Sequence, residues 1–327
     1  MIIRHDKTLE ELQELYASPL LELIAKSNIV HNRFHDPGEI QVCSLISIKT
    51  GGCPEDCKYC AQSSRYQTSI SAQPMMQYEE VISEAKKAVE RGATRVCLGA
   101  AWREVRDSKQ FDEILRMIKG ITALGIEVCC TLGMIKDHQA EKLKEAGLYA
   151  YNHNLDTSEN FYKTIITTRT FKDRLNTLDI IEKANISVCS GGILGMGETI
   201  HDRLELLLTL SRRNPHPESV PINRLTQIPG TPLEEQPHIS GWEMIRAIAV
   251  ARIVLPKTMI RLSAGRIEMT CEEQALCFLA GANSIFAGEK LLTVANTPID
   301  RDDRMFRILG LRKRPAFVKG GKYDLVS

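Results

Sequence analysis

Residues 42–60 read VCSLISIKTGGCPEDCKYC, a β-rich run that leads through two glycines into a loop with three cysteines. The cysteines, Cys53, Cys57 and Cys60, have the spacing C-x3-C-x2-C. Soft thiolate ligands this close together in a polar, turn-rich loop favour an iron–sulfur cluster or zinc. A closed structural site uses four ligands, whereas a site that performs chemistry keeps one position open. Three cysteines on a four-iron cluster would leave one iron free for a small molecule, and a zinc loop with a distant fourth ligand is the alternative.

Strand-like and helix-like segments alternate along the chain. Short β-rich runs occur at 42–48, 95–100, 127–132, 149–155, 187–193, 219–225, 259–263 and 284–286. Stretches with apolar residues at i, i+3 and i+4, typical of amphipathic helices, occur at 78–90, 111–124, 171–183, 202–212, 242–254 and 272–279. Eight strands alternating with helices predict an α/β fold whose parallel sheet closes as a (β/α)8 TIM-type barrel over residues 39–290.

Two further segments flank the predicted barrel. Residues 1–38 are expected to form an N-terminal helical extension, because Thr8 with Glu11 is typical of a capping box and Ser18-Pro19 of a second helix start. Residues 291–327 are expected to form a short C-terminal tail that is rich in proline and charge. The basic run at 312–314 within this tail is interpreted as a solvated surface stretch.

The predicted strands carry an apolar and a polar set of side chains, because successive residues on a strand face opposite sides. The apolar set should face the helices: Val96, Leu98, Val128, Val188, Val220, Ile222, Ile260, Leu262 and Ile285. The polar set should face the barrel axis: Cys43, Ser47, Lys49, Arg95, Cys97, Cys129, Thr131, Asn152, Asn154, Asp156, Cys189, Ser219, Asn223, Arg261, Ser263 and Ser284. Since burying unpaired polar groups is costly, we expect the barrel to hold polar cofactors and a substrate. A hydrogen-bonded interior without a ligand is the alternative.

Three cysteines of the polar set, Cys97, Cys129 and Cys189, are interpreted as ligands of a second cluster deeper in the barrel. A fourth ligand would come from another strand. Arg261 has the right orientation, but a charged guanidinium is a poor metal ligand, so residue chemistry alone would not select it.

The neighbours Cys129 and Cys130 must point to opposite sides of their strand. Because Val128 belongs to the apolar set, Cys129 should face the axis and Cys130 the helices. Cys43 should also face the axis, but we expect it not to be a ligand.

Composition narrows the class of protein. Lys and Arg number 42 against 41 Asp and Glu, so no global field favours nucleic acid or a membrane surface. No apolar run reaches the length of a membrane span, and the charged N-terminus is unlike a signal peptide. Ten cysteines in a chain of 327 residues fit a reducing compartment, which predicts a cytoplasmic protein.

The loop of Cys53, Cys57 and Cys60 resembles the motif of the radical S-adenosylmethionine (SAM) superfamily. Nearly the whole chain resembles one family within it, the biotin synthase family. The resemblance rests on residues 51–64 (GGCPEDCKYCAQSS), 96–102 (VCLGAAW), 151–158 (YNHNLDTS), 188–192 (VCSGG), 195–199 (GMGET), 219–223 (SVPIN) and 261–266 (RLSAGR). As a departure from the family, Cys43 replaces a small hydroxyl residue.

The resemblance implies a role for each matching position. Cys53, Cys57 and Cys60 would hold a [4Fe–4S] cluster that binds SAM, and these cysteines with Arg261 would be the catalytic residues. The ligands of a [2Fe–2S] cluster would be Cys97, Cys129, Cys189 and Arg261. Asn154 and Asp156 would lie near the SAM ribose, Arg174 near its carboxylate and Tyr59 beside its adenine. Asn154 and Asn223 would contact the ureido ring of dethiobiotin.

The activity implied is the last step of biotin biosynthesis, the SAM-dependent radical insertion of sulfur from the [2Fe–2S] cluster into dethiobiotin. The implied partners are dethiobiotin, SAM, an external reductant such as a flavodoxin or ferredoxin, and a second copy of the chain in a homodimer. A methylornithine-forming or hydrogenase-maturing radical SAM enzyme is the first alternative. It would need Cys53, Cys57 and Cys60 but not the four deeper ligands. A metal-stabilised binding protein without catalysis is the second.

Overall fold

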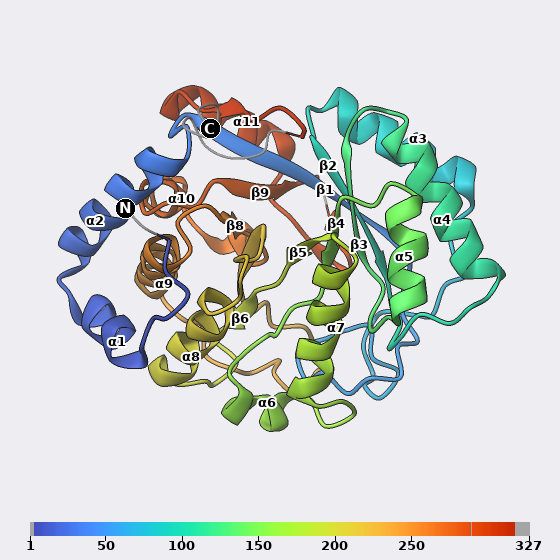
Figure 1. Cartoon of the computed structure of the whole chain (residues 1–327), viewed down its shortest axis with the longest axis horizontal. Coiled ribbons are helices and arrows are strands. Elements are labelled where there is room, and N and C mark those ends of the chain that lie inside the picture. The colour runs from blue at the N-terminus through green and yellow to red at the C-terminus, as the bar shows by residue number, and fades with distance from the viewer. Residues whose placement is uncertain (1–2, 289, 318–327) are drawn as a thin grey trace.

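The computed structural model describes residues 3–288 and 290–317, and within them eight parallel strands close into a barrel (Figure 1). The strands are β1 (Glu39–Lys49), β2 (Arg95–Ala100), β3 (Glu127–Thr131), β4 (Ala150–Asn152), β5 (Ser187–Cys189), β7 (Ser219–Arg224), β8 (Met259–Leu262) and β9 (Ser284–Ala287). Pairing of β1 with β9 closes the ring, and each of the other strands pairs with the next in chain order. The predicted (β/α)8 barrel is confirmed.

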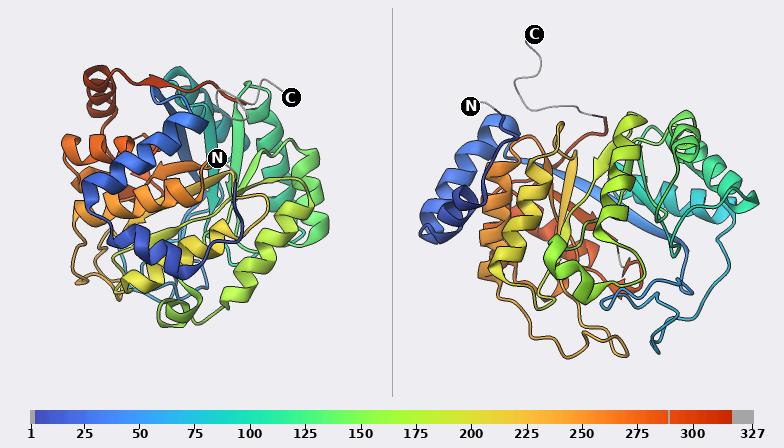
Figure 2. Two further views of the ribbon diagram at one scale, coloured as in Figure 1. Left: turned by 60° about the vertical axis from the view of Figure 1, so that its left-hand side comes forward. Right: turned by 60° about the horizontal axis from the view of Figure 1, so that its bottom comes forward.

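Helices surround the barrel on its outside, as two further views show (Figure 2). They are α3 (Tyr78–Glu90), α4 (Lys109–Thr122), α5 (Asp137–Glu145), α6 (Glu159–Ile165), α7 (Phe171–Lys183), α8 (Ile200–Ser211), α9 (Gly241–Val254) and α10 (Cys271–Leu279). The sequence analysis missed α5 and α6. The α5 sequence, DHQAEKLKE, has too few apolar residues to show a helical period, and α6 is only seven residues long.

The fifth predicted strand is interrupted. The chain forms β5, bends at Ser190 and Gly191, and continues as β6 (Gly192–Leu194), which among the described strands pairs only with β7. A Cβ atom on Gly191 would lie 1.9 Å from the carbonyl oxygen of Pro221, so only glycine allows this close approach. The bend lets the loop after β4 pair with the start of β6, at Asp156 and Gly192.

The segments before and after the barrel pack against it. Helices α1 (Leu9–Ala17) and α2 (Leu20–Phe34) lie against α8 and α9, and Thr8 forms the predicted capping box with Glu11. The segment after β9 is more ordered than the tail we expected. It contains β10 (Lys290–Leu291) paired with β11 (Val294–Ala295), α11 (Ile299–Leu309), and β12 (Arg312–Lys313) paired with β1.

The basic run near the end of this segment only partly matches the prediction of a solvated stretch. Arg312 and Lys313 are exposed, but Arg314 is buried. Residues 318–327 of the expected tail lie outside the described residues.

The two predicted faces of the strands are confirmed by packing. All nine apolar residues of the helix-facing set belong to the main hydrophobic core, together with Cys130. Cys43, Cys97, Cys129, Ala150 and Cys189 form a separate buried cluster at the axis. The register of β3 is therefore as predicted, with Cys129 inward and Cys130 outward.

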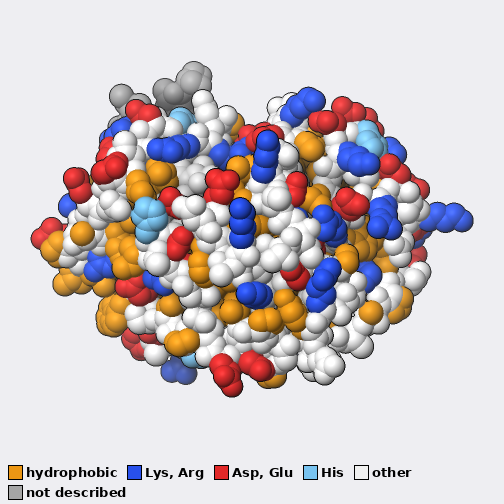
Figure 3. Space-filling model, turned by 90° about the horizontal axis from the view of Figure 1, so that it is seen from below, with side chains coloured by type: hydrophobic (Ala, Val, Ile, Leu, Met, Phe, Trp, Pro, Cys, Tyr) orange, Lys and Arg blue, Asp and Glu red, His pale blue; other side chains and the backbone are white. Residues whose placement is uncertain are grey.

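The surface carries no extended area of one charge on the face shown in Figure 3, where acidic and basic side chains are interspersed. Among the described helices, none combines the length and apolar character that crossing a membrane requires.

Candidate active site

The three-cysteine loop follows β1 at the C-terminal end of the barrel, where barrel enzymes build their sites. Gly51 and Gly52 turn the chain with φ of +72° and +71°, and a Cβ on Gly51 would lie 2.7 Å from the carbonyl oxygen of Ser71. Behind the turn, Cys57 is buried and Cys53 and Cys60 are half-buried. Burial, together with the nearby Cys57, raises the pKa of Cys60 to about 12, so the free thiol is protonated, whereas a coordinating thiol is deprotonated by its metal.

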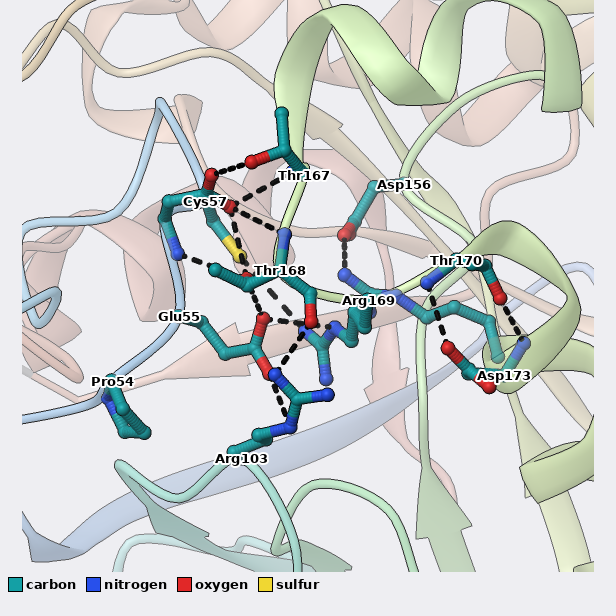
Figure 4. A network of polar contacts seen from close by, with 12 residues as sticks. Pro54, Glu55, Cys57, Arg103, Asp156, Thr167, Thr168, Arg169, Thr170 and Asp173 are labelled. Atoms are coloured by element: carbon teal, nitrogen blue, oxygen red, sulfur yellow. Dashed lines mark hydrogen bonds and ion pairs between the residues drawn. The ribbon is translucent and has the colours of Figure 1, made fainter.

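The loop is fastened to the segment between α6 and α7 (Figure 4). Asp56 accepts hydrogen bonds from the backbone N–H groups of Thr167 at 2.9 Å and Thr168 at 3.2 Å, and from the Thr167 hydroxyl. Glu55 accepts a hydrogen bond from the Thr168 hydroxyl. The Lys58 N–H donates to the carbonyl of Ile165 at 3.1 Å. These contacts bridge more than 100 positions of sequence and fix the loop against the barrel rim.

A cavity of about 320 Å³ connects this loop with the barrel interior. Its lining includes the loop cysteines Cys53, Cys57 and Cys60 and, deeper, Cys97, Cys129 and Arg261. All of the predicted cluster ligands except Cys189 therefore face a common space.

The deeper cysteines form a row at the barrel axis, with Cys43 on β1, Cys97 on β2, Cys129 on β3 and Cys189 on β5. The thiol of Cys97 contacts those of Cys43 and Cys129, and Cys129 also contacts Cys189. Contact with Cys129, and the Arg261 charge beyond it, lower the pKa of Cys189 to about 6 in spite of burial. Contacts with Cys129 and Cys43 also lower the pKa of Cys97, whereas contacts with Cys189 and Cys97 raise that of Cys129, and burial raises that of Cys43. Cys97 and Cys189 are therefore biased toward the thiolate, the form in which cysteine binds metal.

Arg261 lies at the end of this row. Its Nη1 is 3.6 Å from the Cys189 sulfur, while Nε donates to Ser284 at 2.9 Å and Nη2 to Gln41 at 3.2 Å. The side chain is buried, and contacts with the Phe286 ring hold it further. Arg261, the predicted fourth ligand, therefore lies beside Cys189, and its hydrogen bonds fix its orientation.

Beneath the row, Arg95 closes the N-terminal end of the barrel. Its Nε donates to Glu127 at 2.7 Å, and Nη1 and Nη2 donate to Glu218 at 2.9 and 2.7 Å. This inward residue is thus paired by structural carboxylates and is not part of the cavity lining.

The predicted SAM-binding residues meet at the rim. The Tyr59 hydroxyl donates to Asp156 at 2.7 Å, and Nη2 of Arg174 donates to the same carboxylate oxygen at 2.5 Å. Arg174 also donates to the carbonyl of Asn154 and to the Tyr162 hydroxyl. Burial opposes the charge of Arg174, but Asp156 raises the Arg174 pKa well above its ordinary value.

The predicted substrate residues Asn154 and Asn223 both line the cavity, but both are also tied to the backbone. The side-chain oxygen Oδ1 of Asn154 accepts from the N–H of Gly191 at 3.1 Å. Asn223 donates to the carbonyl of Gly192 at 2.9 Å and accepts from the N–H of Ala264 at 3.2 Å. Asn223 therefore also joins the ends of β6, β7 and β8.

Three residues that line the cavity were not predicted from the sequence: the buried Glu55 and His153 and the partly buried Arg169. His153 keeps an Nε2 atom without a hydrogen-bond partner, and burial and nearby arginines hold its pKa well below the ordinary value. Glu55 and His153 lie within residues 51–64 and 151–158, on which the family resemblance rests, so their place in these stretches could have indicated a site role. Arg169 lies in no such motif and is brought to the loop only by the fold.

Among the described residues, no three His, Cys, Asp or Glu side chains converge on one point as the ligands of a single ion do. What favours iron–sulfur clusters is the grouping of the thiols around one cavity and the number of soft ligands in each group.

Solved structures with the same fold include methylornithine synthase, with a TM-score of 0.79, 19% identity and 94% of each chain covered. The FeFe-hydrogenase maturase from Carboxydothermus hydrogenoformans has a TM-score of 0.79 and 17% identity over 94% of this chain and 76% of its own. At these identities the likeness shows the fold alone.

Two family models match the chain. The model of the radical SAM superfamily matches residues 47–210, and that of the biotin and thiamin synthesis associated domain matches residues 221–312.

Curated relatives match nearly the full length. Biotin synthase from Cytophaga hutchinsonii is 58% identical, with 97% of this chain and 94% of that protein covered. Biotin synthase from Chlamydia abortus is 61% identical over 95% and 94%, and that from Nostoc punctiforme 58% identical over 96% and 95%. The chain belongs to the biotin synthase family of radical SAM enzymes.

Proposed function

We propose that this enzyme inserts one sulfur atom into dethiobiotin to form biotin, with SAM as co-substrate and a [2Fe–2S] cluster as the sulfur donor. The observation that carries the proposal is the single cavity lined both by the loop of Cys53, Cys57 and Cys60 and by the deeper Cys97, Cys129 and Arg261. A radical generated at the rim and a sulfur source in the interior can then act on one substrate bound between them.

The two clusters would supply chemistry that side chains lack: reductive cleavage of SAM to a carbon radical, and a sulfide to insert at unactivated carbon. Cys53, Cys57 and Cys60 would hold the [4Fe–4S] cluster at the rim. Cys97, Cys129, Cys189 and Arg261 would hold the [2Fe–2S] cluster. The arrangement of Arg261 beside Cys189 supports this assignment, because its hydrogen bonds to Ser284 and Gln41 orient it without a ligand present.

The residues around Asp156 would position SAM. Asp156 is held between Tyr59 and Arg174, which suits a carboxylate that accepts hydrogen bonds from a ribose. Tyr59 would border the adenine, and the N–H groups of Arg174 that remain after its contacts with Asp156 and Asn154 would face the SAM carboxylate.

The side-chain amides of Asn154 and Asn223 would recognise the ureido ring. A side-chain amide can donate to and accept from a neutral urea, but the side-chain oxygen of Asn154 already accepts from Asn152 and Gly191. The Asn154 nitrogen makes no hydrogen bond to a described acceptor, which leaves it for the substrate. An external reductant such as a flavodoxin or ferredoxin would supply the electron. The enzyme would act as a homodimer in the cytoplasm.

The function is tested by replacing Cys57 with alanine in protein reconstituted with iron and sulfide. We expect no 5′-deoxyadenosine, because the variant cannot hold the cluster that cleaves SAM, and an intact [2Fe–2S] spectrum, because the deep cysteines are unchanged. Cys277→Ala serves as the control, since Cys277 is buried in α10 far from the loop in sequence. SAM cleavage at the parent rate by the Cys57 variant would contradict the proposal.

A further inference from the structure

Arg169 stands between the loop that carries Cys57 and the helix that carries Arg174. Its Nη2 lies 3.9 Å from the Cys57 sulfur, and its side chain is 8% exposed. Its Nε is buried and has no hydrogen-bond partner. A buried guanidinium with an unused donor beside a cavity marks a place where a ligand is expected.

Glu55 fixes this guanidinium without using up its donors. The Glu55 carboxylate lies 3.8 Å from Nε of Arg169 and 3.5 Å from Nε of Arg103, which is too long for a hydrogen bond in either case. One of its oxygens accepts from Thr168, and the other, which faces Arg103, has no hydrogen-bond partner. Figure 4 shows both arginines converging on this carboxylate.

The contacts of Asp56 and Arg103 with residues 167 and 168 keep Arg169 in place. Residues 167 and 168 are bonded to Asp56, and Arg103 donates to the carbonyl of Thr168 at 2.5 Å. Arg169 follows directly in the chain, so its position relative to Cys57 is set by the same contacts that hold the cysteine loop. Arg174, the other nearby cation, is instead paired with Asp156.

From this geometry we infer that Arg169 is a positioning residue of the four-iron site, which donates to the Cys57 sulfur and makes the cluster easier to reduce. The inference rests on the proposed function. Reduction adds one electron from the external reductant and hence one negative charge to the site. A fixed positive charge and a hydrogen bond at a ligand sulfur stabilise that state, and both are known to set cluster potentials.

The test compares Arg169→Met with the matched control Arg103→Met in reconstituted enzyme without SAM. The Arg103 side chain contacts the same Glu55 and the same threonine segment but no cysteine sulfur. The reduction potential of the four-iron cluster is measured by redox titration followed by EPR. For Arg169→Met we expect the ratio of reduced to oxidised cluster at a fixed solution potential to fall about tenfold, a shift of about 59 mV for one electron. Arg103→Met removes one contact to residue 168 but leaves the Arg169 guanidinium beside the Cys57 sulfur, so we expect a clearly smaller shift.

Arg169→Lys keeps the positive charge but loses the planar guanidinium. Its reduction potential should therefore lie between those of the parent and Arg169→Met. It also serves as the test should Arg169→Met fail to fold. An unchanged potential in both Arg169 variants would overturn the inference, as would an equal shift in Arg103→Met. If the potential is unchanged while SAM binds more weakly, Arg169 contacts the SAM carboxylate instead. Parent enzyme without any four-iron signal would refute the proposed function itself.

Discussion

At the scale of the residue, the direction in which a side chain leaves its strand decides which thiols can share a cluster. Cys129 and Cys130 are adjacent, yet Cys129 lies in the group of buried cysteines at the barrel axis and Cys130 packs in the main hydrophobic core. This distinction was predictable because Val128 marks the apolar side of the strand. The contact between Cys97 and Cys43 was not, because it depends on the stagger between β1 and β2, which pairs Leu45 with Cys97.

A first prediction follows for the two neighbouring cysteines. Cys129→Ala should lose the [2Fe–2S] cluster and biotin formation but keep the [4Fe–4S] cluster, because it removes a proposed ligand of the deep cluster alone. Cys130→Ala, its matched control, should keep both clusters. Iron and sulfide analysis with Mössbauer spectra distinguishes the clusters, and the reverse pattern would mean that the strand register is off by one residue.

A second prediction concerns Asn223. Asn223→Leu should weaken dethiobiotin binding by one to two decades, since losing a buried polar partner costs about 1–3 kcal/mol. Reductive SAM cleavage should remain. Because Asn223 also bonds Gly192 and Ala264, a lower unfolding midpoint is expected as well. Calorimetry on the folded variant measures the dethiobiotin affinity. An unchanged affinity would show that Asn223 does not contact the substrate.

At the scale of the element, strands were easier to predict than the contacts that join loops. The β-rich runs gave β2 its observed bounds, and α3 and α7 also agree with prediction. The clamp of Asp56 on Thr167 and Thr168 could not be predicted, because hydroxyl and carboxylate partners 111 and 112 positions apart leave no local pattern. Nor did periodicity reveal α11, a charged helix whose buried Asp302 pairs with Arg266.

A third prediction concerns the strands that Arg95 ties together. Arg95→Met leaves the buried Glu127 and the partly buried Glu218 without their cation, so the free energy of unfolding should fall by about 3–5 kcal/mol. Lys183→Met, which breaks an ion pair exposed on both sides, should change it by less than about 0.5 kcal/mol. Urea unfolding of the cluster-free proteins compares the two variants. Equal, small effects would show that the Arg95 pairs contribute little to the barrel.

At the scale of the whole molecule, the barrel was predictable from the alternation of strands and helices, and its polar axis from the two faces of the strands. The sequence does not reveal how the strands near the two ends of the chain pair with one another. The strand β1 pairs with β2, the next strand of the barrel, with β9, the last strand of the barrel, and with β12, which follows α11. Such long-range pairings depend on closure of the whole ring and have no signature in any one segment.

In the proposed mechanism, one cavity joins a radical source to a sulfur source. This mechanism is tested by rebuilding the enzyme anaerobically with iron and ³⁴S-labelled sulfide, then adding SAM, a reductant and dethiobiotin, and analysing the products by mass spectrometry. We predict 5′-deoxyadenosine and biotin, with ³⁴S in the biotin because the inserted atom comes from the cluster. Formation of 5′-deoxyadenosine without biotin, or of biotin without the label, would contradict this account.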